Sequence, residues 1–288
     1  MDAPKTGFLH KILATGTAKD PLFLDGDDMV VDDDDGVSVA TDVGDLEILF
    51  PADTMAGTSN NKRKADQIAV QETDFVPGNL DHSALPMIAS PGWATTQATK
   101  RLQKDLHAVL KVQDTTPLHE LGWYVDSEFV TNVYQWIVEL HSFDKDLPLA
   151  ADMKSNGLKS IVLELRFGKD YPMSPPFVRV IRPRFLPFTQ GGGGHVTAGG
   201  ALCMELLTNN GWSAVASIES VLLQVRLAMS SIDPRPARLD TGPARDYGVG
   251  EAVDAYIRAC QTHGWTVPQG FREMAYGGSP DTSAYGPY

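Results

Sequence analysis

Hydrophobic side chains recur every three or four residues in three stretches of the chain, the spacing that places them on one face of an α-helix. In "TTQATKRLQKDLHAVLKVQ" the apolar face comprises Leu102, Leu106, Val109 and Leu110. In "SIESVLLQVRLAMS" it comprises Ile218, Val221, Leu222, Val225 and Met229, and Ser217 is a residue type that caps helix N-termini. In "VGEAVDAYIRACQTHGW" it comprises Val249, Val253, Ile257 and Cys260. We predict three helices, the last ending near Gly264.

Three runs between the first two helices predict β-strands, because they are rich in β-branched and aromatic residues. They are "YQWIVELHSF", "KSIVLELRFG" and "PFVRVIRP", and "WYVDSEF" offers an earlier fourth strand. In the second run Ile161, Leu163, Leu165 and Phe167 alternate with other residues, which predicts a half-buried strand. Short turns favour an antiparallel meander, whereas "RPRFLPFTQGGGGHVTAGG" predicts an irregular segment. The fold class predicted is α+β: an N-terminal helix, a four-stranded antiparallel meander, an irregular segment and C-terminal helices.

The charge pattern divides the chain. The net charge is −13, and most of it belongs to residues 1–92, which include "DGDDMVVDDDDG". We predict that 1–92 is an acidic, largely disordered N-terminal region, that 93–268 forms the core domain, and that 269–288 is a flexible C-terminal tail. Neither part has the basic face of a nucleic-acid-binding protein, so we expect no nucleic-acid partner.

Several classes of protein are disfavoured by composition. No stretch approaches the roughly 18 consecutive apolar residues of a membrane helix, and the N-terminus lacks the apolar core of a signal peptide. Two cysteines do not make a disulfide framework, and the seven histidines do not pair with either thiol at metal-ligand spacing. We therefore expect no membrane association, no metal site, and a cytoplasmic or nuclear location.

The two cysteines lie in different settings. Cys260 falls on a helical apolar stripe, where a thiol behaves as a small core hydrophobe. Cys203 lies in irregular sequence after Gly199 and Gly200, residues that allow unusual backbone conformations and close approach of other segments. Such a thiol is reachable from solvent, but no histidine and asparagine pair typical of a cysteine protease accompanies it. The residues alone leave catalytic and passive roles for Cys203 open.

Three motifs in order resemble those of ubiquitin-conjugating enzymes. The turn "YPMSPP" presents Tyr171, Pro172, Pro175 and Pro176; "GALC" presents Gly200, Leu202 and Cys203; and Trp212 and Ser213 open the loop before the second predicted helix. The resemblance covers about Trp93 to Pro268. Within the family it is strongest to the Q-type branch, on "GGALCMELLTNNGW", "SIESVLLQV" and the late "HGWTVP".

The resemblance implies an enzyme that accepts ubiquitin from an activating enzyme as a thioester on Cys203 and transfers it to a substrate lysine or a ligase. A thiolate suits this task because it is both a good nucleophile and a good leaving group. The resemblance implies no bound cofactor, since ATP is used by the activating enzyme. The alternative is a catalytically silent ubiquitin-binding module; the presence of Cys203 argues against it, and the absence of the family's His-Pro-Asn motif argues for it. A thiol-dependent hydrolase would need a base near Cys203.

Two further residues are candidates for the site. His195 lies eight positions before Cys203, where most of the family has the asparagine of a His-Pro-Asn motif. It either donates a hydrogen bond to the reaction's oxyanion or braces the loop, and we favour the brace. Glu205 occupies the position of an acidic gate residue in relatives. It either orients the incoming amine or is an ordinary solvated carboxylate.

The resemblance also implies partner surfaces. Lys100, Arg101 and Lys104 on the first helix would contact the activating enzyme, whereas a solvated helix face is the alternative. The expected ligase-binding residues are Pro172, Met173, Pro175, Ser213 and Ala214. Met173 and Ala214 replace a common aromatic residue and a common proline, which leaves the type of ligase open. The acidic strings "MVVDDDDG" and "DLEILF" either add as strands to a small modifier such as SUMO or only solubilise the chain, and we favour the second.

Overall fold

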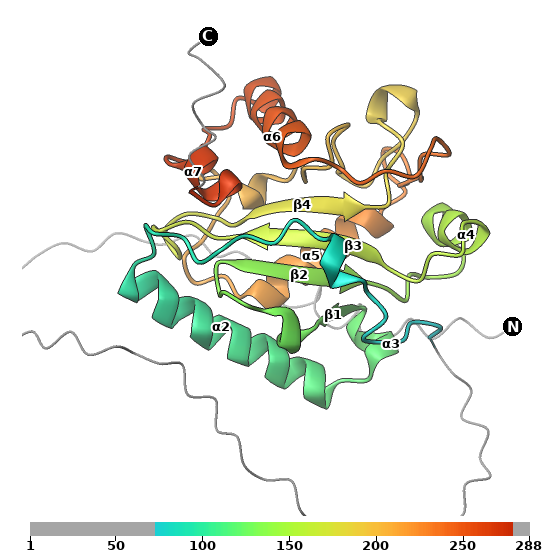
Figure 1. The fold of residues 1–288 in the computed structure, drawn as a ribbon. Coiled ribbons are helices and arrows are strands. Elements are labelled where there is room, and N and C mark those ends of the chain that lie inside the picture. The colour runs from blue at the N-terminus through green and yellow to red at the C-terminus, as the bar shows by residue number, and fades with distance from the viewer. Residues whose placement is uncertain (1–72, 279–288) are drawn as a thin grey trace, which may run out of the picture. The chain divides into compact units, whose positions relative to one another are not determined.

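The computed structural model describes residues 73–278, and the predictions for 1–72 and 279–288 lie outside this range. The helices are α2 (Thr96–Thr115), α3 (Leu118–Leu121), α4 (Pro148–Ser155), α5 (Ile218–Ser230), α6 (Val249–His263) and α7 (Phe271–Tyr276). The strands are β1 (Trp123–Val125), β2 (Gln135–Leu140), β3 (Ile161–Arg166) and β4 (Phe177–Arg182). Figure 1 shows the four strands in one sheet with helices around it.

The sheet is an antiparallel meander in the order β1-β2-β3-β4. One face carries alternate residues such as Val138, Leu163 and Val180, and together with α2 and α5 it builds the main hydrophobic core. Ser217 caps α5 by accepting a hydrogen bond from Ser220 N at 3.1 Å, as its residue type predicts. The predicted α+β class, the meander and the three long helices are therefore confirmed.

The second face of the sheet is also covered, which corrects the prediction that β3 is half-buried. All six residues of β3 are buried, including Glu164 and Arg166. On this face Glu164 forms ion pairs with Arg166 and with Arg179 of β4. Apolar residues from a segment outside the meander, such as Leu85, pack beside them. The alternation along β3 is real, but it distinguishes an apolar face from a buried polar face.

The first cover of this face is the segment before α2, which the sequence analysis assigned to the disordered region. Leu85 packs with Ile137, Val162 and Ile181 from three strands, and Phe75 is 4% exposed. Gln135 Oε1 accepts from Ile88 N at 2.8 Å. Residues 73–92 therefore belong to the packed part of the chain, and in Figure 1 this segment crosses the sheet. Its apolar residues are too irregularly spaced to predict an element.

The second cover is formed by α6 and α7, which lie together beside β4 (Figure 1). Residues 269–278 were predicted to be part of a flexible tail, and this is wrong for the described portion. Phe271 stacks on Tyr256 with ring centroids 4.5 Å apart and meets Phe177 edge-on at 5.0 Å. A six-residue helix is too short to show a periodic pattern of apolar residues, so the sequence does not predict the burial of Phe271.

Helix α4 was also absent from the sequence predictions. Pro148 stands at its first turn, and Leu149 and Met153, four residues apart, are its buried positions. In the predicted fourth strand, β1 covers Trp123–Val125, and Ser127–Phe129 form a 3₁₀ turn instead of continuing it.

Candidate active site

Cys203 follows a segment that pairs with the free edge of β4. Leu202 N donates to Val178 O at 3.1 Å, and Val180 N donates to Gly200 O at 2.8 Å. Ala201 lies opposite Arg179 in this pairing. The segment before the thiol is therefore fixed to the sheet by main-chain hydrogen bonds, although its sequence predicts irregular structure.

Two glycines allow helix α6 and the chain before it to approach this segment. A Cβ at Gly199 would lie 2.2 Å from Glu251 O of α6, and a Cβ at Gly200 would lie 2.6 Å from the Tyr247 ring. Gly200 also has a φ of 89°, in the region that side chains resist. The glycines preceding Cys203 are thus required by close packing as well as by backbone conformation.

The two cysteines differ in exposure as their sequence settings predict. Cys260 is 1% exposed in the α6 cluster, whereas Cys203 is partly exposed. Burial raises the pKa of the Cys203 thiol above its ordinary value, and the proximity of Cys260 raises it further. No hydrogen bond to the Cys203 sulfur is present within residues 73–278, so no base is placed to activate it.

His195 lies directly across a tight turn from Cys203. Cys203 N donates to His195 O at 2.8 Å, and Thr197 N donates to Ala201 O at 2.9 Å. The His195 ring adds a third link, because Nδ1 lies 3.0 Å from Cys203 O and a carbonyl can only accept. His195 adopts a φ of 58°, and its side chain is otherwise exposed. This geometry favours the bracing role, because Nδ1 ties the ring to Cys203 O and leaves only Nε2 for another contact.

Glu205 begins the 3₁₀ turn Glu205–Leu207 that follows the thiol, and its side chain is exposed. Tyr256 of α6 fixes this turn by donating to Leu207 O at 2.9 Å. Tyr256 was not predicted from the sequence, because the predicted apolar face of this helix consisted of Val249, Val253, Ile257 and Cys260. Its hydroxyl is buried, so it requires a partner, and the turn after Cys203 supplies one.

The two loops expected to bind a ligase lie side by side. Trp212 Nε1 donates to Pro172 O at 2.7 Å, and the Tyr171 and Trp212 rings are 6.3 Å apart. Met173 is 68% exposed and Val215 is 89% exposed, so each loop presents one apolar side chain. Ser213 is exposed and Ala214 is half-buried, whereas Pro172 and Pro175 are buried and shape the turn. Val215 was not selected from the sequence, where one valine in a loop gives no signal.

The basic residues of α2 do not form a uniform face. Lys100 and Lys104 are exposed. Arg101 pairs with Asp105 at 2.9 Å, and its Nη1 donates to Ala214 O at 3.0 Å. Arg101 therefore holds the 214–216 loop on α2 and is only partly available to a partner.

No cluster of histidine, cysteine, aspartate or glutamate suited to hold a metal ion occurs among the described residues. In the same part of the chain, no helix has the length and apolar character needed to cross a membrane.

The comparisons of the sequence with known proteins indicate one family. The profile of the family "Ubiquitin-conjugating enzyme" matches residues 158–242. The mouse (Mus musculus) ubiquitin-conjugating enzyme E2 Q-like protein 1 is 36% identical over 149 residues, which cover 50% of this chain and 89% of that protein. The chain therefore belongs to the ubiquitin-conjugating enzyme family.

Further relatives place it with the Q-type branch. The fruit fly (Drosophila melanogaster) Q-like protein CG4502 is 30% identical over 72% of this chain, and mouse ubiquitin-conjugating enzyme E2 Q1 is 34% identical over 60% of it. The chain spans 66% of the fly protein and 40% of mouse E2 Q1. Among solved structures, the Plasmodium falciparum ubiquitin-conjugating enzyme is 22% identical with a TM-score of 0.34, covering 46% of this chain and 99% of that one.

Proposed function

We propose that this chain carries ubiquitin as a thioester on Cys203 and passes it to a substrate lysine or to a ligase. The observation that supports this best is the contrast between its two thiols. Cys203 is partly exposed on a segment anchored to β4 and follows the family's glycine motif, whereas Cys260 is 1% exposed in a core.

The loading step is thioester exchange. The Cys203 thiolate attacks the carbonyl carbon of the thioester that joins ubiquitin to the activating enzyme, and the activating enzyme's thiolate leaves. One C–S bond forms and one breaks, so the step needs only a deprotonated thiol and no dedicated base. This agrees with the absence of a basic partner at the Cys203 sulfur among residues 73–278.

The transfer step is more demanding. A lysine amine attacks the ubiquitin carbonyl, an oxyanion develops, an amide forms, and the Cys203 thiolate leaves. Glu205 is exposed two residues from the thiol, where its carboxylate orients the amine and receives its proton. His195 supports this step by holding Cys203 O, which keeps the turn closed while the oxyanion forms.

Two surfaces would receive partners. Lys100 and Lys104 attract an acidic region of the activating enzyme. Met173 and Val215, on loops joined by the Trp212–Pro172 hydrogen bond, form an apolar surface for a ligase. Ubiquitin, the activating enzyme, a ligase and protein substrates are thus the partners that we propose.

The test is loading by an activating enzyme with ATP and ubiquitin, observed on a non-reducing gel for the parent, Cys203→Ala and Cys260→Ala. We expect a thiol-sensitive adduct with the parent and with Cys260→Ala, and none with Cys203→Ala. The absence of an adduct with any ubiquitin-like modifier would instead support the silent binding module.

A further inference from the structure

A pocket of about 280 Å³ that Cys203 does not line lies between the segment before α2, strand β4 and the start of α6. Its walls include Ser83, Ala84, Pro86, Arg179, Tyr247 and Val249. None of the residues assigned above to loading, transfer or partner binding lines it, so the proposed function leaves it without a role.

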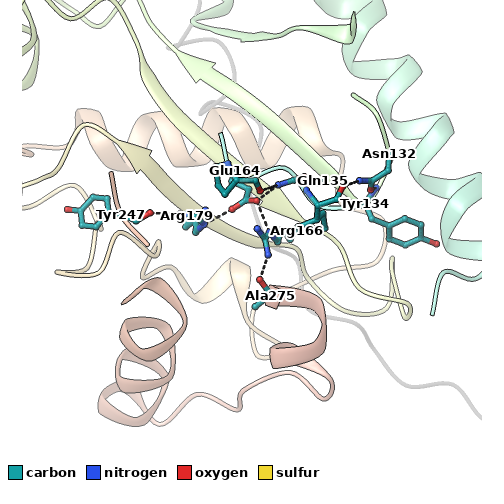
Figure 2. A network of polar contacts seen from close by, with 10 residues as sticks. Asn132, Tyr134, Gln135, Glu164, Arg166, Arg179, Tyr247 and Ala275 are labelled. Carbon is teal, nitrogen blue, oxygen red and sulfur yellow. Dashed lines mark hydrogen bonds and ion pairs between the residues drawn. The ribbon is translucent and has the colours of Figure 1, made fainter. Parts of the chain in front are cut away.

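One of the residues that line this pocket, Arg179, has a buried guanidinium with one unpaired nitrogen. Arg179 is 0% exposed; its Nε donates to Glu164 at 2.5 Å and its Nη1 donates to Tyr247 O at 3.0 Å (Figure 2). Its Nη2 has no hydrogen-bond partner. A guanidinium carries five N–H donors and no acceptor, so two buried donors remain at Nη2 for a ligand.

The N-terminus of α6 supplies a second group of donors at the same place. This helix has 15 residues, and Gly248 at its N-cap has no side chain with which to cap the first turn. Glu251 accepts from Gly248 N at 2.9 Å, but no side chain of the described residues accepts from Val249 N. The first N–H groups of a helix have no intrahelical acceptors and carry partial positive charge, so they favour an anion.

The charges around the pocket leave a positive surplus. Arg166 and Arg179 share a single buried carboxylate, that of Glu164. Asp246, the one carboxylate in the pocket wall, is paired with Arg182 at 2.7 Å. Glu251, near the start of α6, is paired with Arg184 at 2.6 Å and with Arg245 at 3.5 Å. Asp81, beside the wall, accepts from Ser83 N at 3.0 Å and feels the charge of Arg182. The five arginines (Arg166, Arg179, Arg182, Arg184, Arg245) still outnumber the four carboxylates (Glu164, Asp246, Glu251, Asp81) by one.

We propose that this pocket binds one oxoanion of phosphate size, held by Arg179 Nη2 and by N–H groups at the start of α6. The volume accommodates a phosphate group with a few waters, and the pocket opens to solvent beside the exposed Ser83. Free phosphate and a phosphorylated side chain share the chemistry that these donors recognise.

The test measures binding to the full chain by calorimetry and by thermal shift, at constant ionic strength. The probes are inorganic phosphate, the tripeptide acetyl-Gly-phosphoserine-Gly-amide, and chloride. We expect saturable binding of one phosphate group and a higher melting temperature than in chloride. Stronger binding of the tripeptide would identify a phosphorylated side chain as the source, and stronger binding of inorganic phosphate would identify the free ion.

Two variants test the location of the site. Ala84→Glu keeps Arg179 but places a carboxylate in the pocket wall, so we expect at least a tenfold loss of phosphate affinity in a folded protein. Arg238→Gln, which removes a surface arginine paired with Asp152 outside the pocket, is expected to bind like the parent. Equal effects of phosphate and chloride, or unchanged affinity in Ala84→Glu, would overturn the proposal.

Discussion

The thiol of Cys203 combines partial exposure with a pKa above its ordinary value, because its surroundings disfavour the thiolate. A raised pKa means that a smaller fraction is deprotonated at neutral pH than for a free cysteine. This limits unwanted oxidation and alkylation, since both require the thiolate. In the proposed loading step this low fraction suffices, because the thioester presented by the activating enzyme is already reactive.

The pH dependence of alkylation follows from this shift. The thiol of a free cysteine has a pKa of about 8.5. The alkylation rate of Cys203 should therefore still rise about tenfold per pH unit between pH 7 and 8.5, and it should level off only above that range. The measurement is site-resolved mass spectrometry of the parent chain after short exposure to iodoacetamide, with a cysteine peptide as reference. A plateau near pH 7 would contradict the assigned environment.

His195 gives a second prediction at this scale. Because its ring bonds to Cys203 O, His195→Ala should slow loading and discharge alike, by about 2- to 12-fold for the loss of one hydrogen bond. Single-turnover loading and discharge to free lysine measure the two steps, and His195→Gln, which can donate from its amide, should recover part of both rates. An effect confined to discharge would show that His195 acts on the oxyanion instead of bracing the turn.

The difference in exposure between the two cysteines was predicted from the sequence, and the structure shows it. The role of Cys203 came from the resemblance to ubiquitin-conjugating enzymes and stays a prediction. The contacts of Tyr256 with the turn after Cys203, and the apolar surface at Val215, depend on residues far apart in the chain. No local pattern reports such contacts, because they arise only when separate elements pack.

At the scale of elements, β3 connects the meander to the segments that cover the second face of the sheet, namely the segment before α2 and the helices α6 and α7. Glu164 accepts from both Arg166 and Arg179, and these arginines in turn donate to Ala275 O and Tyr247 O (Figure 2). Gln135 joins the same carboxylate to Pro86 O of the segment before α2. One buried carboxylate thereby links β2, β3 and β4 to both covering segments.

Removal of this carboxylate should be costly. Glu164→Gln leaves two buried guanidinium groups without a counter-charge, and we expect it to lower the free energy of unfolding by about 3–5 kcal/mol. The matched control is Asp152→Asn, which breaks a pair with the 47%-exposed Arg238 and should cost about 1 kcal/mol or less. Urea denaturation of both variants measures the difference, and equal losses would contradict the role given to Glu164.

Strand β3 also shows why the alternation of apolar residues predicted the burial of only one of its two faces. Ile161, Leu163 and Leu165 were assigned to the core face, where they lie. Glu164 and Arg166 were assigned to the solvent face because charged residues are rarely buried without partners. Their partners outside β3 come from β2, β4 and α7, and no feature of the β3 sequence predicts them.

At the scale of the molecule, the packed unit extends beyond the motif-bearing region on both sides. Residues 73–92 cover the sheet face through Phe75 and Leu85, and α7 covers it through Phe271. The predicted core domain, 93–268, was bounded by the extent of the resemblance to ubiquitin-conjugating enzymes, Trp93 to Pro268. Packing extends further because short segments with one or two anchoring side chains bury apolar area without any periodic pattern.

This extension predicts a difference between two truncations. Deletion of residues 1–92 removes the side chains of Phe75 and Leu85, each worth about 1.5–3 kcal/mol of burial, whereas deletion of 1–72 keeps them. We expect the shorter protein to be less stable by about 3–6 kcal/mol in urea denaturation. Equal stability would place the domain boundary at Trp93 after all.

The account rests on Cys203 as the carrier of ubiquitin, and intact-mass spectrometry after loading tests it most directly. The predicted result is one added ubiquitin, less one water, on the parent and on Cys260→Ala, removed by excess thiol and absent from Cys203→Ala. Fragmentation should place the modification on Cys203. An adduct that persists in Cys203→Ala, or one that resists thiol on the parent, would contradict the assignment.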